Sequence, residues 1–194
     1  MMGGAAIKER LRDGARDSAN VLGRIAIGVA FSTFMAGAVF MYADWPTPSL
    51  PADATADRVV VYKSQRRLIL LSKGEVLREY KIALGPHPVG PKELEGDGKT
   101  PEGLYRINHR NDRSEFHLSL QISYPNADDI ARAKKERVAP GGQIMIHGLR
   151  NGNEAVGRLH RYTDWTDGCI AVTNWEIEEL WRAVPDGTVI DLHQ

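Results

Sequence analysis

An uncharged run of 18 residues, from Ile25 to Tyr42, is the feature that most restricts how this 194-residue chain can fold. A helix of that length reaches across a hydrocarbon core about 30 Å thick. Tyr42 and Trp45 follow at its far end, where amphipathic aromatic side chains suit a membrane interface. The run therefore predicts one N-terminal transmembrane helix, acting as a signal anchor, at residues 25–42.

The segments on either side of this run set its predicted orientation. Residues 1–24 carry more Lys and Arg than Asp and Glu, which predicts a cytoplasmic N-terminal segment. Residues 43–56 contain several prolines and predict a semi-stiff linker. We expect a single-pass protein of the inner (cytoplasmic) membrane, with residues 57–194 on its periplasmic side. A buried core helix and a cleaved signal peptide, for which Ala36-Gly37-Ala38 is a small-residue site, are the alternatives.

The remainder of the chain is rich in short β-type runs separated by turns, which is typical of a mainly β domain. We expect a β-sandwich or flattened barrel over residues 57–194, with a few short helices. One helix is predicted near Asp128–Arg137, and a capping box, Thr173-x-x-Glu176, predicts the start of another. The predicted strands are Arg58–Tyr62, Arg67–Leu71, Val76–Leu84, Leu104–Asn108, Phe116–Tyr124, Gln143–Ile146 and Val189–His193.

Charge and motif content argue against nucleic-acid and nucleotide binding. Lys+Arg and Asp+Glu each number 25, so the formal net charge is zero and no excess of basic residues indicates a nucleic-acid partner. Gly98-Lys99-Thr100 resembles the end of a phosphate-binding loop, but Glu93 stands where that motif requires glycine. No cofactor is predicted.

Two residues suggest chemistry, namely the single cysteine, Cys169, and His147. His147 ends a strand-like run, and Cys169 stands at a predicted loop-to-strand junction. A thiol and an imidazole are the minimal parts of a nucleophilic acyl-transfer site, and the imidazole is expected to lower the pKa of the thiol. A lone cysteine is more often a small buried side chain. His160, interpreted as a surface residue, is the rival base. No second cysteine is available for a metal site.

The order and spacing of these residues resemble a known family. His147-Gly148, a spacer and Thr166-Asp167-Gly168-Cys169 are similar to the signature of the L,D-transpeptidase (YkuD-type) catalytic domain, and the resemblance covers residues 57–194. Residues 95–103 also resemble the Gly-Asp-x-x-Thr-Pro-x-Gly turn of that family. The chain departs from the family at Asp167, where His is frequent, and at Ala171, where Arg is frequent. Because both departures lie beside Cys169, the sequence does not identify the group that would accept the acyl chain.

The resemblance implies a cysteine acyltransferase that acts on peptidoglycan stem peptides without a cofactor or metal. Cys169 is the implied nucleophile and His147 the acid and base, with backbone amides at Gly168 and Cys169 facing the oxyanion. An amine of an envelope protein is one implied acceptor. A hydrolase on the same scaffold (L,D-carboxypeptidase or amidase) and a non-catalytic cell-wall-binding module are the alternatives. The expected oxyanion and substrate contacts are Gly148, Arg161, Thr166, Asp167 and Gly168.

Overall fold

The computed structural model describes residues 23–39, 41–42 and 48–194, and the chain divides into two units, Met1–Trp45 and Pro46–Gln194. In the first unit, residues 23–39 and 41–42 are helical. Within the described residues, no helix is both long and apolar enough to cross a membrane. The anchor at residues 25–42 therefore stays a prediction. Most of the predicted cytoplasmic segment and the first part of the predicted linker lie outside the described residues.

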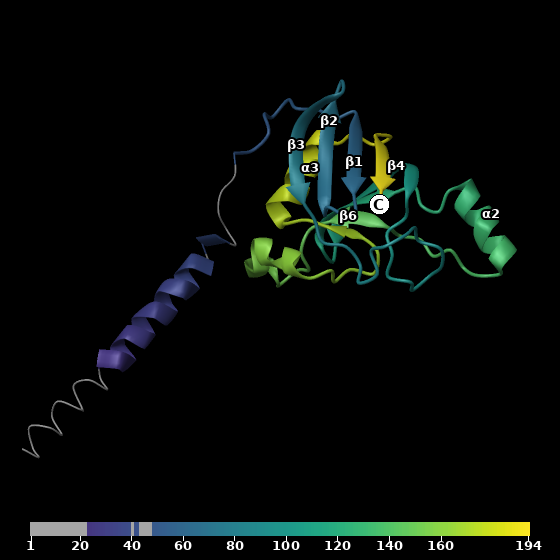
Figure 1. Ribbon diagram of the computed structural model, residues 1–194. Coiled ribbons are helices and arrows are strands. Elements are labelled where there is room, and N and C mark those ends of the chain that lie inside the picture. The colour runs from purple at the N-terminus through teal and green to yellow at the C-terminus, as the bar shows by residue number, and fades with distance from the viewer. Residues whose placement is uncertain (1–22, 40, 43–47) are drawn as a thin grey trace, which may run out of the picture. The chain divides into compact units, whose positions relative to one another are not determined.

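The second unit is built on a mixed sheet of eight strands in the order β3-β2-β1-β8-β4-β5-β6-β7. Figure 1 shows the neighbouring strands β3, β2 and β1 side by side. Neighbouring strands are antiparallel except for two parallel pairs, β1 with β8 and β6 with β7. The strands are β1 Arg58–Tyr62, β2 Arg67–Ser72, β3 Glu75–Lys81, β4 Gly103–Ser114, β5 His117–Ile122, β6 Met145–His147, β7 Ile170–Ala171 and β8 Val189–His193.

Two features make the sheet curl back on itself. Strand β4 is shared, because its first four residues pair with β8 and its remaining length pairs with β5. The two ends of the strand order meet at an isolated bridge between Ala83 and Ala171. Two backbone hydrogen bonds, of 3.0 and 2.9 Å, hold this bridge together. The predicted mainly β fold with a few helices is confirmed.

Apolar side chains that point inward from the strands build the core. In β1 Val59 and Val61 point inward, and in β2 Leu68 and Leu70 do so, all without solvent exposure. Strand β8 has the predicted bounds. Strand β4 runs six residues beyond the predicted Asn108, because its polar second half pairs with β5 across an irregular hairpin and does not depend on apolar alternation.

The second unit has two α-helices, both of which begin with a capping box. Helix α2, Ala127–Glu136, lies close to the predicted segment and is capped by Asn126. Helix α3, Asn174–Ala183, begins at the predicted Thr173–Glu176 box. It buries Ile177 and Leu180 and packs against β5 and β6, which brings it behind the strand that ends in His147. A kinked 3-10 segment, η1 Glu154–Tyr162, was not predicted.

Candidate active site

Pairing between β6 and β7 brings the two predicted catalytic residues to the same edge of the sheet. Their register places Ile146 opposite Ile170, in parallel. Cys169 directly precedes β7 and therefore lies opposite Met145, two residues before His147 on the neighbouring strand, so residues 22 positions apart in sequence come close together in space. Both side chains line one open cleft.

The tautomer of His147 follows from its hydrogen bond. The Nδ1 atom lies 2.7 Å from the carbonyl oxygen of Gly148. A carbonyl can only accept, so Nδ1 carries the proton in the neutral ring and Nε2 is left as the basic nitrogen. His147 is 4% exposed, and burial lowers its pKa to about 4. The imidazole is therefore neutral near pH 7 and able to accept a proton.

Two aromatic rings hold the imidazole of His147 in place. The ring of Phe116 lies 4.5 Å from it, centroid to centroid, and that of Trp165 lies 5.6 Å away at a steep angle. Both rings also line the cleft. The sequence interpretation missed both residues. For Trp165 a signal existed, since it stands immediately before the Thr166–Cys169 signature, whereas Phe116 looked like any apolar strand residue.

The thiol of Cys169 is half-buried and contacts the backbone of Met145 and of Gln143. Its Sγ lies 3.6 Å from the carbonyl oxygen of Gln143. Burial raises the pKa of the thiol; the hydrogen bond from the Met145 backbone offsets part of this rise, and the negative charge of Asp167 adds to it. The expectation that the imidazole lowers this pKa is therefore wrong: a neutral ring provides no positive charge, and loss of water disfavours the thiolate. The resting pair is a neutral thiol with a neutral imidazole.

The hydroxyl group of Thr166 holds the turn that carries Cys169. The Oγ1 of Thr166 donates to the carbonyl oxygen of Cys169 at 2.7 Å and accepts the N–H of Gly168 at 3.3 Å. The amide of Gly168 is thus occupied and is not a free oxyanion donor. The amide of Cys169 has no hydrogen-bond acceptor within the described part of the chain, so it is available to an oxygen atom of a bound molecule.

Gly148 has a structural role that the sequence only hinted at. Its N–H lies 3.1 Å from the carbonyl oxygen of Phe116 and 3.3 Å from that of Leu118, so it is not available to substrate. A Cβ atom at this position would lie 2.7 Å from Oδ1 of Asn174. Glycine is therefore required for close packing, and the carbonyl of Gly148 is the group that orients His147.

Arg161 and His160 both differ from their predicted surroundings. Arg161 forms an ion pair with Glu176 of α3 and does not line the cleft, so it is not placed to meet a substrate carboxylate. His160 is 5% exposed and not a surface residue. Its Nδ1 lies 3.5 Å from the indole Nε1 of Trp165, and burial lowers its pKa to about 3. The 3-10 segment η1 buries it, a fold that its polar sequence did not predict.

Asp167 remains as a charged group beside Cys169. Its side chain is exposed and lines the cleft, whereas Ala171 is fully buried in the bridge with Ala83 and faces no substrate. Of the two departures from the family signature, only Asp167 can therefore act on an acceptor directly.

The cleft has a volume of about 1060 Å³, large enough for a peptide side chain and its neighbours. Arg150 and Asn153 line it together with the aromatic rings, and Lys92 and Glu95 line it together with Cys169. Among the described residues, no three His, Cys, Asp or Glu side chains lie close enough together to hold a metal ion.

The sheet and the cleft together define a mainly β domain with a thiol and an oriented imidazole in one substrate-sized cleft. The chain belongs to the YkuD family, the L,D-transpeptidase catalytic domain, whose sequence model matches residues 56–192.

Individual relatives agree with this assignment. The chain is 32% identical over 137 residues to YafK of Escherichia coli strains K12 and O157:H7, whose name assigns it provisionally to the L,D-transpeptidases. The match covers 68% of this chain and 48% of YafK. The crystal structure of the helical cell shape determining protein Pgp2 from Campylobacter jejuni superposes with a TM-score of 0.54 at 26% identity, covering 72% of this chain and 48% of Pgp2. The chain thus spans about half the length of these relatives.

Proposed function

We propose that this protein is a cysteine acyltransferase acting on peptidoglycan stem peptides. The observation that carries the proposal is a neutral His147 with a basic Nε2, in the same cleft as the only thiol of the chain. The family assignment and the name of Pgp2 support a substrate in the cell wall. No cofactor or metal is part of the proposed reaction.

The reaction proceeds through a thioester. The sulfur of Cys169 attacks the carbonyl carbon of the third stem residue, the L-centre of meso-diaminopimelate, while the thiol proton passes to Nε2 of His147. The Cys169 amide stabilises the tetrahedral oxyanion. Collapse breaks the bond to the terminal D-alanine, and His147 returns the proton to the departing amine. An acceptor amine then attacks the thioester, gives its proton to His147 and releases the free thiol.

The acceptor decides between a transpeptidase and a hydrolase. A specific observation keeps the hydrolase, an L,D-carboxypeptidase or amidase, as the second candidate: the carboxylate of Asp167 is exposed in the cleft beside Cys169. A carboxylate there can hold a water molecule, but it can equally attract the ammonium form of an acceptor, such as an amine of an envelope protein. The non-catalytic module is the weaker candidate, because the catalytic pair is intact.

Muropeptide products distinguish the three functions directly. We expect the purified protein, incubated with tetrapeptide-bearing muropeptides, to yield cross-linked dimers, because an amine is a stronger nucleophile than water towards a thioester. Mass spectrometry of the products measures the result. Trimmed monomers without dimers would replace the transpeptidase by the hydrolase, and unchanged muropeptides would support the binding module. The Cys169→Ala variant is the matched control.

We further propose that residues 25–42 anchor the protein in the inner membrane, with the catalytic domain on the periplasmic side. The support is the uncharged sequence run and its charged flank. A reporter that is active only outside the cytoplasm, fused after Gln194, is expected to be active. The control is the same fusion with three Lys residues inserted within residues 25–42. If Cys169 reacts with a membrane-impermeant thiol reagent only after the inner membrane is lysed, the orientation is wrong.

A further inference from the structure

The peptide unit between Gly168 and Cys169 determines where the proposed oxyanion donor points. The carbonyl oxygen of Gly168 and the N–H of Cys169 belong to the same planar trans peptide, and they point in opposite directions. Any group that holds this carbonyl therefore also sets the direction of the Cys169 N–H. In the structure, the Oγ1 of Thr100 donates to the Gly168 carbonyl at 2.9 Å.

The Gly168–Cys169 peptide needs a fixed partner, because its first residue is a glycine with a flexible backbone. Gly168 has a φ of +107°, a region that glycine enters freely and other residues rarely adopt. A Cβ atom at Gly168 would lie 2.3 Å from the carbonyl oxygen of Lys99, so no larger residue fits. The conformational freedom of glycine lets this peptide rotate unless its carbonyl has a fixed partner. Among the described residues, the hydroxyl of Thr100 is that partner.

Thr100 is held in place by groups buried in the protein interior, away from the cleft. Its side chain is fully buried and does not line the cleft, so the Gly168 carbonyl points into the protein and the Cys169 N–H points the other way. The carbonyl of Thr100 accepts from Nζ of Lys63 at 3.0 Å. Lys63 is also fully buried and bonds Gly90 and Glu102, at 2.6 and 2.8 Å, which ties it to both ends of the same loop.

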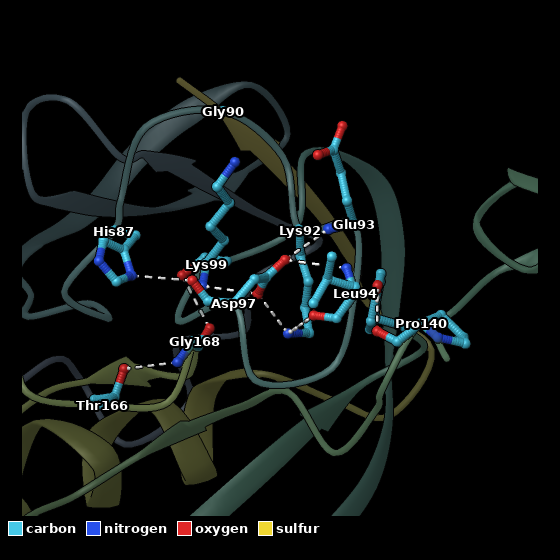
Figure 2. A network of polar contacts seen from close by, with 12 residues as sticks. His87, Gly90, Lys92, Glu93, Leu94, Asp97, Lys99, Pro140, Thr166 and Gly168 are labelled. Carbon is cyan, nitrogen blue, oxygen red and sulfur yellow. Dashed lines mark hydrogen bonds and ion pairs between the residues drawn. The ribbon is translucent and has the colours of Figure 1, made fainter. Parts of the chain in front are cut away.

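The loop that carries Thr100 is ordered by Asp97 (Figure 2). Its carboxylate accepts from Nζ of Lys92 at 2.8 Å and from the backbone N–H groups of Glu93, Leu94 and Lys99, at 2.8, 3.1 and 3.0 Å. Burial opposes ionisation here, but these donors lower the pKa of Asp97 to about 2. The carboxylate therefore stays charged throughout the neutral range, and the loop presents a stable surface to Gly168.

We propose that Thr100 is a positioning residue: its hydroxyl holds the Gly168 carbonyl inward and so keeps the Cys169 amide directed at the developing oxyanion. This inference rests on the proposed cysteine acyl transfer. It assigns a function to the Gly-Asp-x-x-Thr-Pro segment, which the sequence alone identified only as a turn.

Two reactions of the same thiol test the proposal. Acylation by a carbapenem develops an oxyanion, whereas alkylation by iodoacetamide does not. In Thr100→Val, acylation is expected to slow by about 10- to 100-fold. This loss is no larger than that from removing an oxyanion donor, because the Cys169 amide is still present and only its direction is no longer fixed. Alkylation, followed across pH, is expected to keep the wild-type rate and thiol pKa. Thr100→Ser keeps the hydroxyl and is expected to restore acylation.

Thr188→Val is the matched control, because the buried hydroxyl of Thr188 also donates to a carbonyl, that of Pro185, but lies outside the cleft and does not bond the Gly168–Cys169 peptide. It is expected to acylate normally. If Thr100→Val does not fold, Thr100→Ala carries the same expectation. Equal loss of acylation and alkylation, or normal acylation in Thr100→Val, would overturn the proposal. Turnover of stem peptides by Cys169→Ala would instead overturn the proposed function.

Discussion

Replacing Cys169 with alanine is expected to abolish turnover of stem peptides while the domain remains folded. The variant lacks the only thiol of the chain, so no thioester can form, and loss of a nucleophile reduces the rate by about 10⁴-fold or more. The side chain is small and half-buried, so its truncation leaves only a small gap in the packing.

Intact-protein mass spectrometry and muropeptide analysis measure this loss, with circular dichroism to check the fold. Cys169→Ser is the matched variant: it preserves the size of the side chain but has a far more weakly acidic group, and it is expected to be inactive as well. Turnover near the wild-type rate in either folded variant would show that Cys169 is not the nucleophile.

Replacing His147 with alanine is expected to change how acylation depends on pH. In the wild type, burial lowers the pKa of His147 to about 4, so the imidazole is an available base at every pH above about 5. Acylation by a carbapenem is therefore expected to be nearly independent of pH from 5 to 8. At pH 7 the variant is expected to react about 10²-fold more slowly or worse, because general-base assistance is lost.

The variant should recover as pH rises. Without the base, the rate follows the thiolate fraction, which increases tenfold per pH unit until the pKa of the thiol is reached. Burial raises that pKa above its ordinary value, so recovery should continue past pH 8.5. Gain of the mass of one carbapenem molecule, followed by intact-protein mass spectrometry over a pH series, measures both profiles.

His160→Ala is the matched comparison. Because His160 contacts Trp165, which in turn packs against His147, a moderate loss of rate is expected, with the pH-independent profile retained. A steep profile in His160→Ala together with a flat one in His147→Ala would identify His160 as the base.

Acid stability limits the series to pH 5 and above. The folded-state pKa of His147 lies below the ordinary value of about 6.5, so the unfolded chain binds the proton first. The contribution of the neutral His147 to folding stability is fully present above pH 6.5 and is lost progressively as the pH falls towards about 4. His160, with a pKa of about 3, adds a loss of the same sign. Circular dichroism at each pH identifies the range in which both variants are folded.

Much of the fold was predictable because its signals are local. Strand β8 and the capping box of α3 depend on residues within a few positions of each other, and the identities of His147 and Cys169 follow from a short signature. Periodicity and capping need no knowledge of distant partners.

Tertiary structure alone decided the electrostatics and the supports of the site. Glu176 is visible in the sequence as a capping residue, but its pairing with Arg161 depends on how η1 packs against α3. The direction of the Cys169 pKa depends on burial, which no spacing specifies. The chain from Lys63 through Thr100 to Gly168 joins three segments far apart in sequence. Such contacts are set by strand register and loop packing, so the sequence by itself identified the proposed reacting groups, and the fold determined their protonation and orientation.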